Sequence, residues 1–260
     1  MDDFNRCIEI LAAGDRNRVW SLVVTIFGDL AQGTGDTLSM QTLARITEPL
    51  GVKPEALRVA LHRLKKDGWI VSQRQGRNSL IGLTDFGRTQ STEAAPLIYR
   101  RTGPNIGQWA IFIASPHSQP SRDELDSIRE SRSSFNVSPN EVIAPAFLAG
   151  DELLRAPFDP TTAPEWVLQS VFPKALQQKY AHLNQRLADL STAMPEMSDP
   201  FKIATLRTLL VHNWRRIVLS HPDVDDVFIP GECRLRECRS QIDQLLTAYP
   251  CPSLDLFESN

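Results

Sequence analysis

The hydrophobic pattern of residues 38–87 predicts two short helices followed by a hairpin. The first helix begins behind Ser39, a good N-cap residue, and ends at Gly51. The second begins at Pro54, which suits the first helical position, and its apolar residues recur every three or four positions. Two β-prone runs separated by Gln75-Gly76 follow, which is typical of a hairpin. Helix, turn, helix and hairpin in this order predict a winged helix-turn-helix.

The exposed face of the second helix is the strongest candidate for a DNA-reading surface. When its apolar positions are turned inward, mostly polar and basic residues are left outside. These residues are Glu55, Arg58, Val59, His62, Arg63 and Lys66. Lys53 precedes the helix, and Arg74 and Arg77 flank the turn of the hairpin. We predict that all of them contact DNA, the helix in the major groove and the hairpin at the backbone or the minor groove.

The charge of residues 51–90 agrees with this interpretation. They contain eight basic and three acidic residues, a net charge of +5, whereas the whole chain has −3 and the remainder therefore −8. A local basic patch on an acidic chain is typical of a surface that binds phosphate backbone. Arg58 and Arg63 have an alternative role in surface ion pairs with Glu55 and Asp67. Such pairs contribute little to stability, so they do not exclude DNA contact.

The chain around this segment is mainly helical, with one short α/β stretch. A helix over residues 16–31 would pack under the two short helices, and Thr84 would cap a short helix after the hairpin. Residues 91–107 are rich in proline and glycine, which predicts a linker. Pro145 interrupts a later strand, so we place that strand at a sheet edge or at a bulge. Proline at 173 would split a long helix over residues 165–190.

The predicted organisation has three domains. The boundaries are 1–90 for the DNA-binding domain, 91–107 for the linker, 108–160 for a small α/β middle domain and 161–260 for a helical C-terminal domain.

Short motifs stand in a distinctive order along the chain. They are Arg18-Val19-Trp20-Ser21-Leu22, Leu61-His62-Arg63-Leu64, Asp67-Gly68-Trp69, Leu83-Thr84-Asp85-Phe86-Gly87, and near the end Pro222-Asp223-Val224-Asp225-Asp226 and Ile229-Pro230-Gly231. This order resembles the PaaX family, the bacterial repressors of phenylacetic acid catabolism. The resemblance covers roughly the first third of the chain and returns near its end.

The resemblance implies an α+β fold that is mainly helical. Its parts would be an N-terminal winged helix-turn-helix, a ferredoxin-like middle domain and a helical C-terminal domain. After Gly150 the chain is short against the family pattern. The predicted middle domain is therefore small and shortened, and the sequence leaves open whether its sheet has all four strands.

The resemblance also implies an inducer, an aryl-acyl-CoA thioester such as phenylacetyl-CoA. The phosphates of the thioester need arginines, and its ring needs an apolar cleft. The candidates for these contacts are Arg207, Trp214, Arg215 and Arg216. All four lie in a predicted helix that begins at Pro200, so packing of that helix on the middle domain is the alternative role of each.

Other chemistry finds no support in the sequence. No metalloprotease, hydrolase, phosphate-loop or dinucleotide motif is present, so we expect neither a catalytic residue nor a cofactor. Of four cysteines only Cys233 and Cys238 are close, and they lack the C-x-x-C spacing of a metal site. No apolar run reaches the ~20 residues that span a bilayer, and the acidic N-terminus is unlike a signal peptide. We expect a cytoplasmic protein without membrane contact.

The sequence therefore predicts a bacterial transcriptional repressor. It would bind operator DNA as a homodimer, with two recognition helices on successive turns of the duplex, and an aryl-acyl-CoA would release it. Two alternatives remain open. The winged helix could bind protein instead of DNA, or it could be an accessory of an enzyme that acts on a CoA ester.

Overall fold

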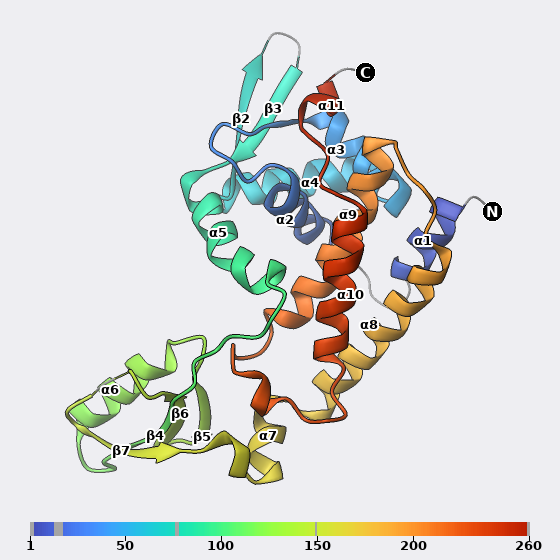
Figure 1. The fold of residues 1–260 in the computed structure, drawn as a ribbon. Coiled ribbons are helices and arrows are strands. Elements are labelled where there is room, and N and C mark those ends of the chain that lie inside the picture. The colour runs from blue at the N-terminus through green and yellow to red at the C-terminus, as the bar shows by residue number, and fades with distance from the viewer. Residues whose placement is uncertain (1–2, 13–17, 76–77, 149, 259–260) are drawn as a thin grey trace. The chain divides into compact units, whose positions relative to one another are not determined.

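The structure, a computed structural model, is α+β and mainly helical, with two small antiparallel sheets (Figure 1). It describes residues 3–12, 18–75, 78–148 and 150–258. These group into two compact units, and each unit combines segments that lie far apart in the sequence. Unit 1 consists of residues 1–99, 183–216 and 238–260, and unit 2 of residues 100–182 and 217–237.

Unit 1 begins with a helix that the sequence did not predict, α1 (Asp3–Ala12). The next elements are α2 (Val19–Leu30), β1 (Leu38–Ser39), α3 (Met40–Thr47), a 3-10 turn (Glu48–Leu50), α4 (Pro54–Lys66), β2 (Ile70–Gln75) and β3 (Asn78–Leu83). The strands form an antiparallel sheet in the order β1-β3-β2. The two predicted short helices and the hairpin strands are therefore present, and Ser39 caps α3, since its hydroxyl accepts a hydrogen bond from the Thr42 N–H at 3.0 Å.

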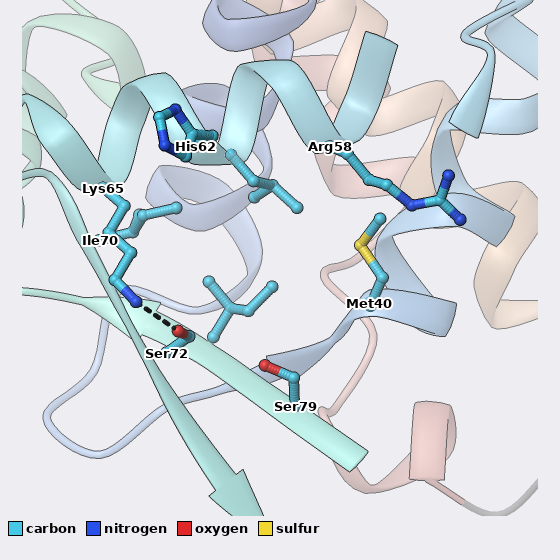
Figure 2. A pocket seen from close by; sticks show the side chains of 9 residues that line it. Met40, Arg58, His62, Lys65, Ile70, Ser72 and Ser79 are labelled. Carbon is cyan, nitrogen blue, oxygen red and sulfur yellow. Dashed lines mark hydrogen bonds between the residues drawn. The ribbon is translucent and has the colours of Figure 1, made fainter. Parts of the chain in front are cut away.

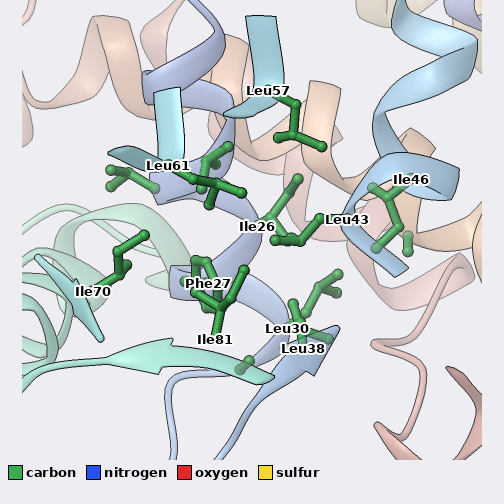
Figure 3. Close-up of a cluster of buried hydrophobic side chains, with 14 of the residues drawn as sticks. Ile26, Phe27, Leu30, Leu38, Leu43, Ile46, Leu57, Leu61, Ile70 and Ile81 are labelled. Atoms are coloured by element: carbon green, nitrogen blue, oxygen red, sulfur yellow. The ribbon is translucent and has the colours of Figure 1, made fainter. Parts of the chain in front are cut away.

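One hydrophobic core joins these elements (Figure 3). Ile26 and Phe27 of α2 lie at its centre and are fully buried. Leu43, Leu57 and Ile81 reach them from the short helices and from the sheet. The core also includes three residues from the C-terminal third of the chain, namely Phe201, Ala204 and Phe257. The segment predicted to be an independent DNA-binding domain therefore shares its core with sequence more than a hundred positions away.

Helix α5 (Asp85–Tyr99) replaces the first half of the predicted linker. Thr84 starts it as predicted, since its hydroxyl accepts a hydrogen bond from the Gly87 N–H at 3.1 Å. The helix then continues past Thr89 and through Pro96, although an internal proline removes one helical hydrogen bond. Burial of Leu97 and Ile98 after the proline supplies the compensating packing.

Unit 2 contains a four-stranded antiparallel sheet, and helix α6 packs on it. Its elements are β4 (Trp109–Ala114), α6 (Gln119–Arg129), β5 (Phe135–Ser138), β6 (Glu141–Pro145) and β7 (Leu153–Phe158). The strand order β5-β6-β4-β7 places β6 between β4 and β5. All four strands are present, which settles the question that the sequence left open. Between β6 and β7 lies a short connection, without a second helix among the residues described there.

The position of Pro145 corrects one prediction. Strand β6 is an inner strand, and the bulge lies on β5 between Asn136 and Ser138. Pro145 is tolerated because it is the last residue of β6 and pairs only with Trp109 of β4, since β5 ends before reaching it.

Helices make up the remaining chain. They are α7 (Glu165–Val171), α8 (Lys174–Ala193), α9 (Pro200–Val218), α10 (Leu235–Ala248) and α11 (Asp255–Glu258), with 3-10 turns at Pro160–Thr162 and Asp226–Phe228. Pro173 separates α7 from α8, as predicted. Asp199 caps α9, since its carboxylate accepts a hydrogen bond from the Phe201 N–H at 2.8 Å. Within the described residues, none of these helices is both long and apolar enough to span a bilayer.

Candidate nucleic-acid interface

Helix α4 is held between two sharply defined ends. Lys53 is its N-cap residue and Pro54 its first helical residue. At the other end Gly68 adopts a left-handed conformation with φ of 74°. The Gly68 N–H donates to the Lys65 carbonyl at 3.2 Å and the Trp69 N–H to the Leu64 carbonyl at 2.9 Å, the two bonds of a Schellman motif. This turn ends the helix just after its basic last turn and directs the chain into β2.

The buried and exposed faces of α4 are those that the sequence predicts. Leu57, Ala60, Leu61 and Leu64 are buried. Lys53, Glu55, Arg58, Val59, His62, Arg63 and Lys66 are all exposed. Val59 is 71% exposed, which is unusual for an aliphatic side chain in a helix and gives this face an apolar point between its charges. The face is thus available to a partner molecule.

Two of its arginines take part in ion pairs with side chains of the same segment. The Arg58 guanidinium lies 3.6 Å from the Glu55 carboxylate, and both side chains are more than two-thirds exposed, at 67% and 76%. Arg63 lies 3.5 Å from Asp67, and its guanidinium also lies 5.1 Å from the centre of the Trp20 ring. Pairs this exposed contribute little free energy, so both arginines can exchange them for phosphate or base contacts.

A basic side chain of α4 contacts the hairpin, and the hairpin carries a further basic residue (Figure 2). Lys65 reaches from α4 to β2, where its Nζ lies 3.1 Å from the Ser72 hydroxyl. Arg74 is exposed further along β2, on the same face of the strand as Ser72, because alternate residues share a face. Arg77 lies outside the described residues.

Two further basic residues of this segment differ in their position. Arg88 is not part of the exposed surface, whereas Lys65 is. Arg88 donates internally to the carbonyl oxygens of Gln32, Gly33 and Leu83, so it braces the chain between α2 and α5. Lys65 was not among the predicted contacts, although its position three residues after His62 places it on the same side of the helix.

The predicted effector residues of α9 lie mostly inside unit 1. Arg207 is 6% exposed and donates to the Asp29 carboxylate and to the backbone oxygens of Leu246 and Tyr249. Trp214 is 1% exposed, and its indole N–H donates to the Ile98 carbonyl at 2.8 Å. These contacts are internal, so the structure gives both residues a packing role.

Arg215 and Arg216 differ from those two residues. Arg215 is half-buried beside α2, and its guanidinium lies 3.1 Å from the Ser21 hydroxyl. Burial, and to a smaller extent the neighbouring Arg216, lower the pKa of Arg215 to about 10. Arg216 is exposed. The four predicted residues thus do not form one surface, and their role in effector binding stays a prediction.

The acidic motif near the C-terminus organises unit 2. Asp223 forms an ion pair with Arg100. The Asp225 carboxylate accepts hydrogen bonds from the Ile106 and Gly107 backbone N–H groups, at 2.7 and 2.9 Å, and from the Trp109 indole at 2.9 Å. These bonds fix the chain just before β4. The motif residues are therefore structural ones.

The described residues were also compared with the pattern of a metal centre. In the part of the chain that the structure describes, no three His, Cys, Asp or Glu side chains come together as metal ligands would. Among the described residues, Cys7, Cys233, Cys238 and Cys251 form no disulfide.

Comparison with known proteins bears on this segment directly. Residues 18–87 match the model of the family described as PaaX-like protein. The predicted resemblance to the PaaX family is confirmed. The chain is also 25% identical to the transcriptional repressor PaaX of Escherichia coli (strain K12), over 81% of this chain and 74% of that protein.

A solved structure has a similar fold over nearly the whole chain. The uncharacterized protein Rv0674 from Mycobacterium tuberculosis matches with a TM-score of 0.53 and 18% identity, over 92% of this chain and 97% of that one. At this identity the likeness concerns the fold alone.

The PaaX-like segment contains every element from α2 to β3. The residues of its last motif, Thr84 and Gly87, pack against the turn that ends α4. Thr84 donates through its hydroxyl to the carbonyl oxygens of Gly68 and Trp69, at 2.5 and 3.2 Å. Gly87 follows where a Cβ atom would overlap the Trp69 carbonyl oxygen. The motif therefore fixes α5 against the turn that ends α4.

Proposed function

We propose that this protein is a transcriptional repressor that binds double-stranded operator DNA through a winged helix-turn-helix. Helix α3 and helix α4 would be the helix-turn-helix, α4 the recognition helix, and the β2-β3 hairpin the wing. The observation that carries this proposal is the exposed face of α4. The residues exposed on this face include Arg58, Val59, His62 and Lys66, and Arg74 is exposed on the hairpin.

Each group has a role in this proposal that its chemistry suits. An α-helix fits the major groove, where an arginine such as Arg58 can donate two hydrogen bonds to guanine. The methyl groups of Val59 suit contact with a thymine methyl. Lys66 and Arg74 would neutralise phosphates on either side. Glu55 would repel phosphate, which suits a residue that restricts where the helix can dock.

The repressor would act as a homodimer in the cytoplasm and respond to an acyl-CoA. Two recognition helices on one face of the duplex need two copies of the chain. The similarity to a repressor of the PaaX family supports an aryl-acyl-CoA inducer such as phenylacetyl-CoA. We do not assign an enzymatic activity to the chain, since its similarity is to a regulator.

Binding of the full chain to selected DNA tests the proposal. A random duplex pool would be enriched on the protein, and the affinity for the preferred sequence measured by fluorescence anisotropy at several salt concentrations. Affinity should fall steeply with salt, and Arg74→Ala should reduce the slope by about one unit, since one phosphate contact is lost. A chain that enriches no sequence and binds duplex without salt dependence would be a protein-binding winged helix instead.

The inducer is tested on the same complex. Phenylacetyl-CoA should release the full chain from the selected duplex, whereas free phenylacetic acid should not, because the acid lacks the phosphates that arginines recognise. Release by the free acid alone would overturn the CoA part of the proposal and leave the repressor part standing. Consumption of the thioester during the measurement would instead support an enzyme.

A further inference from the structure

A pocket lies between helix α4 and the β1-β3-β2 sheet of unit 1 (Figure 2). Its volume is about 280 Å³, which is close to the lower limit of ~300 Å³ for small-molecule sites in proteins. It is lined by Met40, Arg58, Leu61, His62, Lys65, Ile70, Ser72, Ser79 and Ile81. Figure 2 shows α4 along one side of this space and the hairpin strands along the other.

The floor of this pocket is apolar. Leu61, Ile70 and Ile81 belong to the unit 1 core, and Met40, which begins α3, packs against that core. The strand register brings Ser72 directly opposite Ile81, so the floor continues along one face of the hairpin. Aliphatic carbons of the core are therefore exposed to solvent in this pocket. A ligand with an apolar body would cover them, which the hydrophobic effect favours.

The rim of the pocket is cationic. Arg58 and Lys65 line it, and Arg74 follows Ser72 on the same face of the hairpin. No carboxylate is among the described residues of the lining. Glu55 is an acidic neighbour of Arg58, at 3.6 Å in an exposed ion pair. Two serine hydroxyls complete the rim and can donate or accept hydrogen bonds.

We propose that this pocket binds a small amphipathic anion, one whose apolar body is two or three aromatic rings or an acyl chain of similar size, larger than phenylacetate, and whose end is a single carboxylate or sulfonate. The apolar body would lie on Leu61, Ile70 and Ile81, and the anionic end would pair with Lys65. Both halves of such a ligand match what the lining offers, whereas a cation or a highly polar sugar matches neither. The site is separate from any acyl-CoA site on α9, since it is built entirely from residues 40–81.

Occupation of the pocket would also compete with DNA. The ligand would lie against the face of α4 that carries Arg58 and His62, and it would draw Lys65 away from Ser72. This consequence rests on the proposed function. Ligand binding itself does not, so it is measured without DNA.

Two fluorescent probes that differ by one charge test the chemistry. Anilinonaphthalenesulfonate carries the sulfonate, and N-phenyl-1-naphthylamine is its uncharged counterpart. On the full chain, Lys65→Gln should raise the dissociation constant of the sulfonate about two- to fivefold, as expected for one exposed ion pair, and leave that of the amine unchanged. Equal effects of Lys65→Gln on both probes would overturn the role of the cationic rim.

Two matched variants test the location. Ser79→Phe fills the pocket from the hairpin, and we expect it to raise the dissociation constants of both probes by at least about tenfold. Gln73→Phe adds the same ring to the opposite face of the hairpin and should change neither. Both are exposed strand positions that accept an aromatic residue, and thermal unfolding would confirm that each variant folds.

Methyl NMR of labelled methionines gives a measurement that does not depend on a variant. Met40 lines the pocket, whereas Met194 and Met197 lie elsewhere in unit 1. The Met40 methyl signal should shift when the sulfonate is added, and the signals of the other two should not. Shifts confined to Met194 and Met197, or retained binding in Ser79→Phe, would overturn the site. The repressor proposal would stand in either case, because none of these measurements involves DNA.

Discussion

The carboxylate of Asp29 and the guanidinium of Arg207 form a paired, two-bond contact inside unit 1. The distances are 2.8 Å from Nη2 to Oδ1 and 2.9 Å from Nε to Oδ2, between side chains that are 2% and 7% exposed. The Tyr99 hydroxyl donates to the same carboxylate at 2.7 Å. The pair joins α2 to α9, so it connects the PaaX-like segment to the C-terminal third of the chain.

Removal of one partner of this pair should destabilise the protein strongly. Arg207→Ala leaves Asp29 buried without its counter-charge, and we expect the free energy of unfolding to fall by about 3–5 kcal/mol. Denaturant unfolding followed by circular dichroism measures this loss. Arg234→Ala is the control, since it removes an exposed pair with Glu237 and should change stability little. Equal losses of unfolding free energy in the two variants would show that the buried pair stabilises the protein no more than the exposed one.

Glycine is required at position 87. A Cβ atom there would overlap the Trp69 carbonyl oxygen, so Gly87→Ala should displace α5 or the turn after α4 and cost about 1–3 kcal/mol. Gly28→Ala is the matched control inside α2. Its Cβ would lie 3.9 Å from the Ser91 hydroxyl oxygen, an ordinary contact, and alanine favours a helix. Thermal melting should therefore separate the two variants, with Gly28→Ala unchanged or more stable.

Arg58 and Glu55 should affect DNA binding in opposite directions. Arg58→Ala removes the proposed base contact, so it should cost ~1–3 kcal/mol on the preferred sequence and reduce the preference over variant sequences. Glu55→Ala removes the acidic partner of Arg58 and should strengthen binding to all sequences. Anisotropy titrations on the preferred duplex and on single-base variants provide both measurements. An unchanged sequence profile in Arg58→Ala would exclude base reading by this residue.

The protein should lose stability in mild acid because of His212. This side chain is fully buried on α9, and burial, with the charges of Arg215 and Arg216, lowers its pKa to about 3. Below a pH of about 6.5 the unfolded chain takes up a proton that the folded chain does not, so the free energy of unfolding falls as the pH falls.

Between pH 6.5 and pH 5 this histidine should account for a loss of at most about 2 kcal/mol. Unfolding curves at both pH values measure it, and His212→Gln should show a smaller loss than the natural chain. His221, whose pKa burial also lowers, adds a similar dependence that remains in this variant. If the natural chain and His212→Gln lose the same free energy of unfolding between the two pH values, His212 is not the group that causes the pH dependence.

Local sequence signals were sufficient to predict the helices of residues 38–87. Ser39, Gly51 and Pro54 each act on backbone groups within a few residues, as a cap, a left-handed turn with φ of 73°, and a helix start. The periodicity of α4 likewise fixed which of its side chains are exposed. Such features depend on chain geometry alone, so they can be predicted without knowledge of the tertiary fold.

Features that depend on contacts between distant residues could not be predicted in the same way. Pro96 and the glycines after it predicted a linker, but burial of Leu97 and Ile98 carries α5 through to Tyr99. Arg207 looked like a ligand for phosphate, but a carboxylate 178 positions away in the sequence binds it. The pocket beneath α4 combines residues of helices and strands that no sequence pattern links. The physical reason is the same throughout: burial and charge pairing are properties of contacts, and these contacts exist only once the chain has folded.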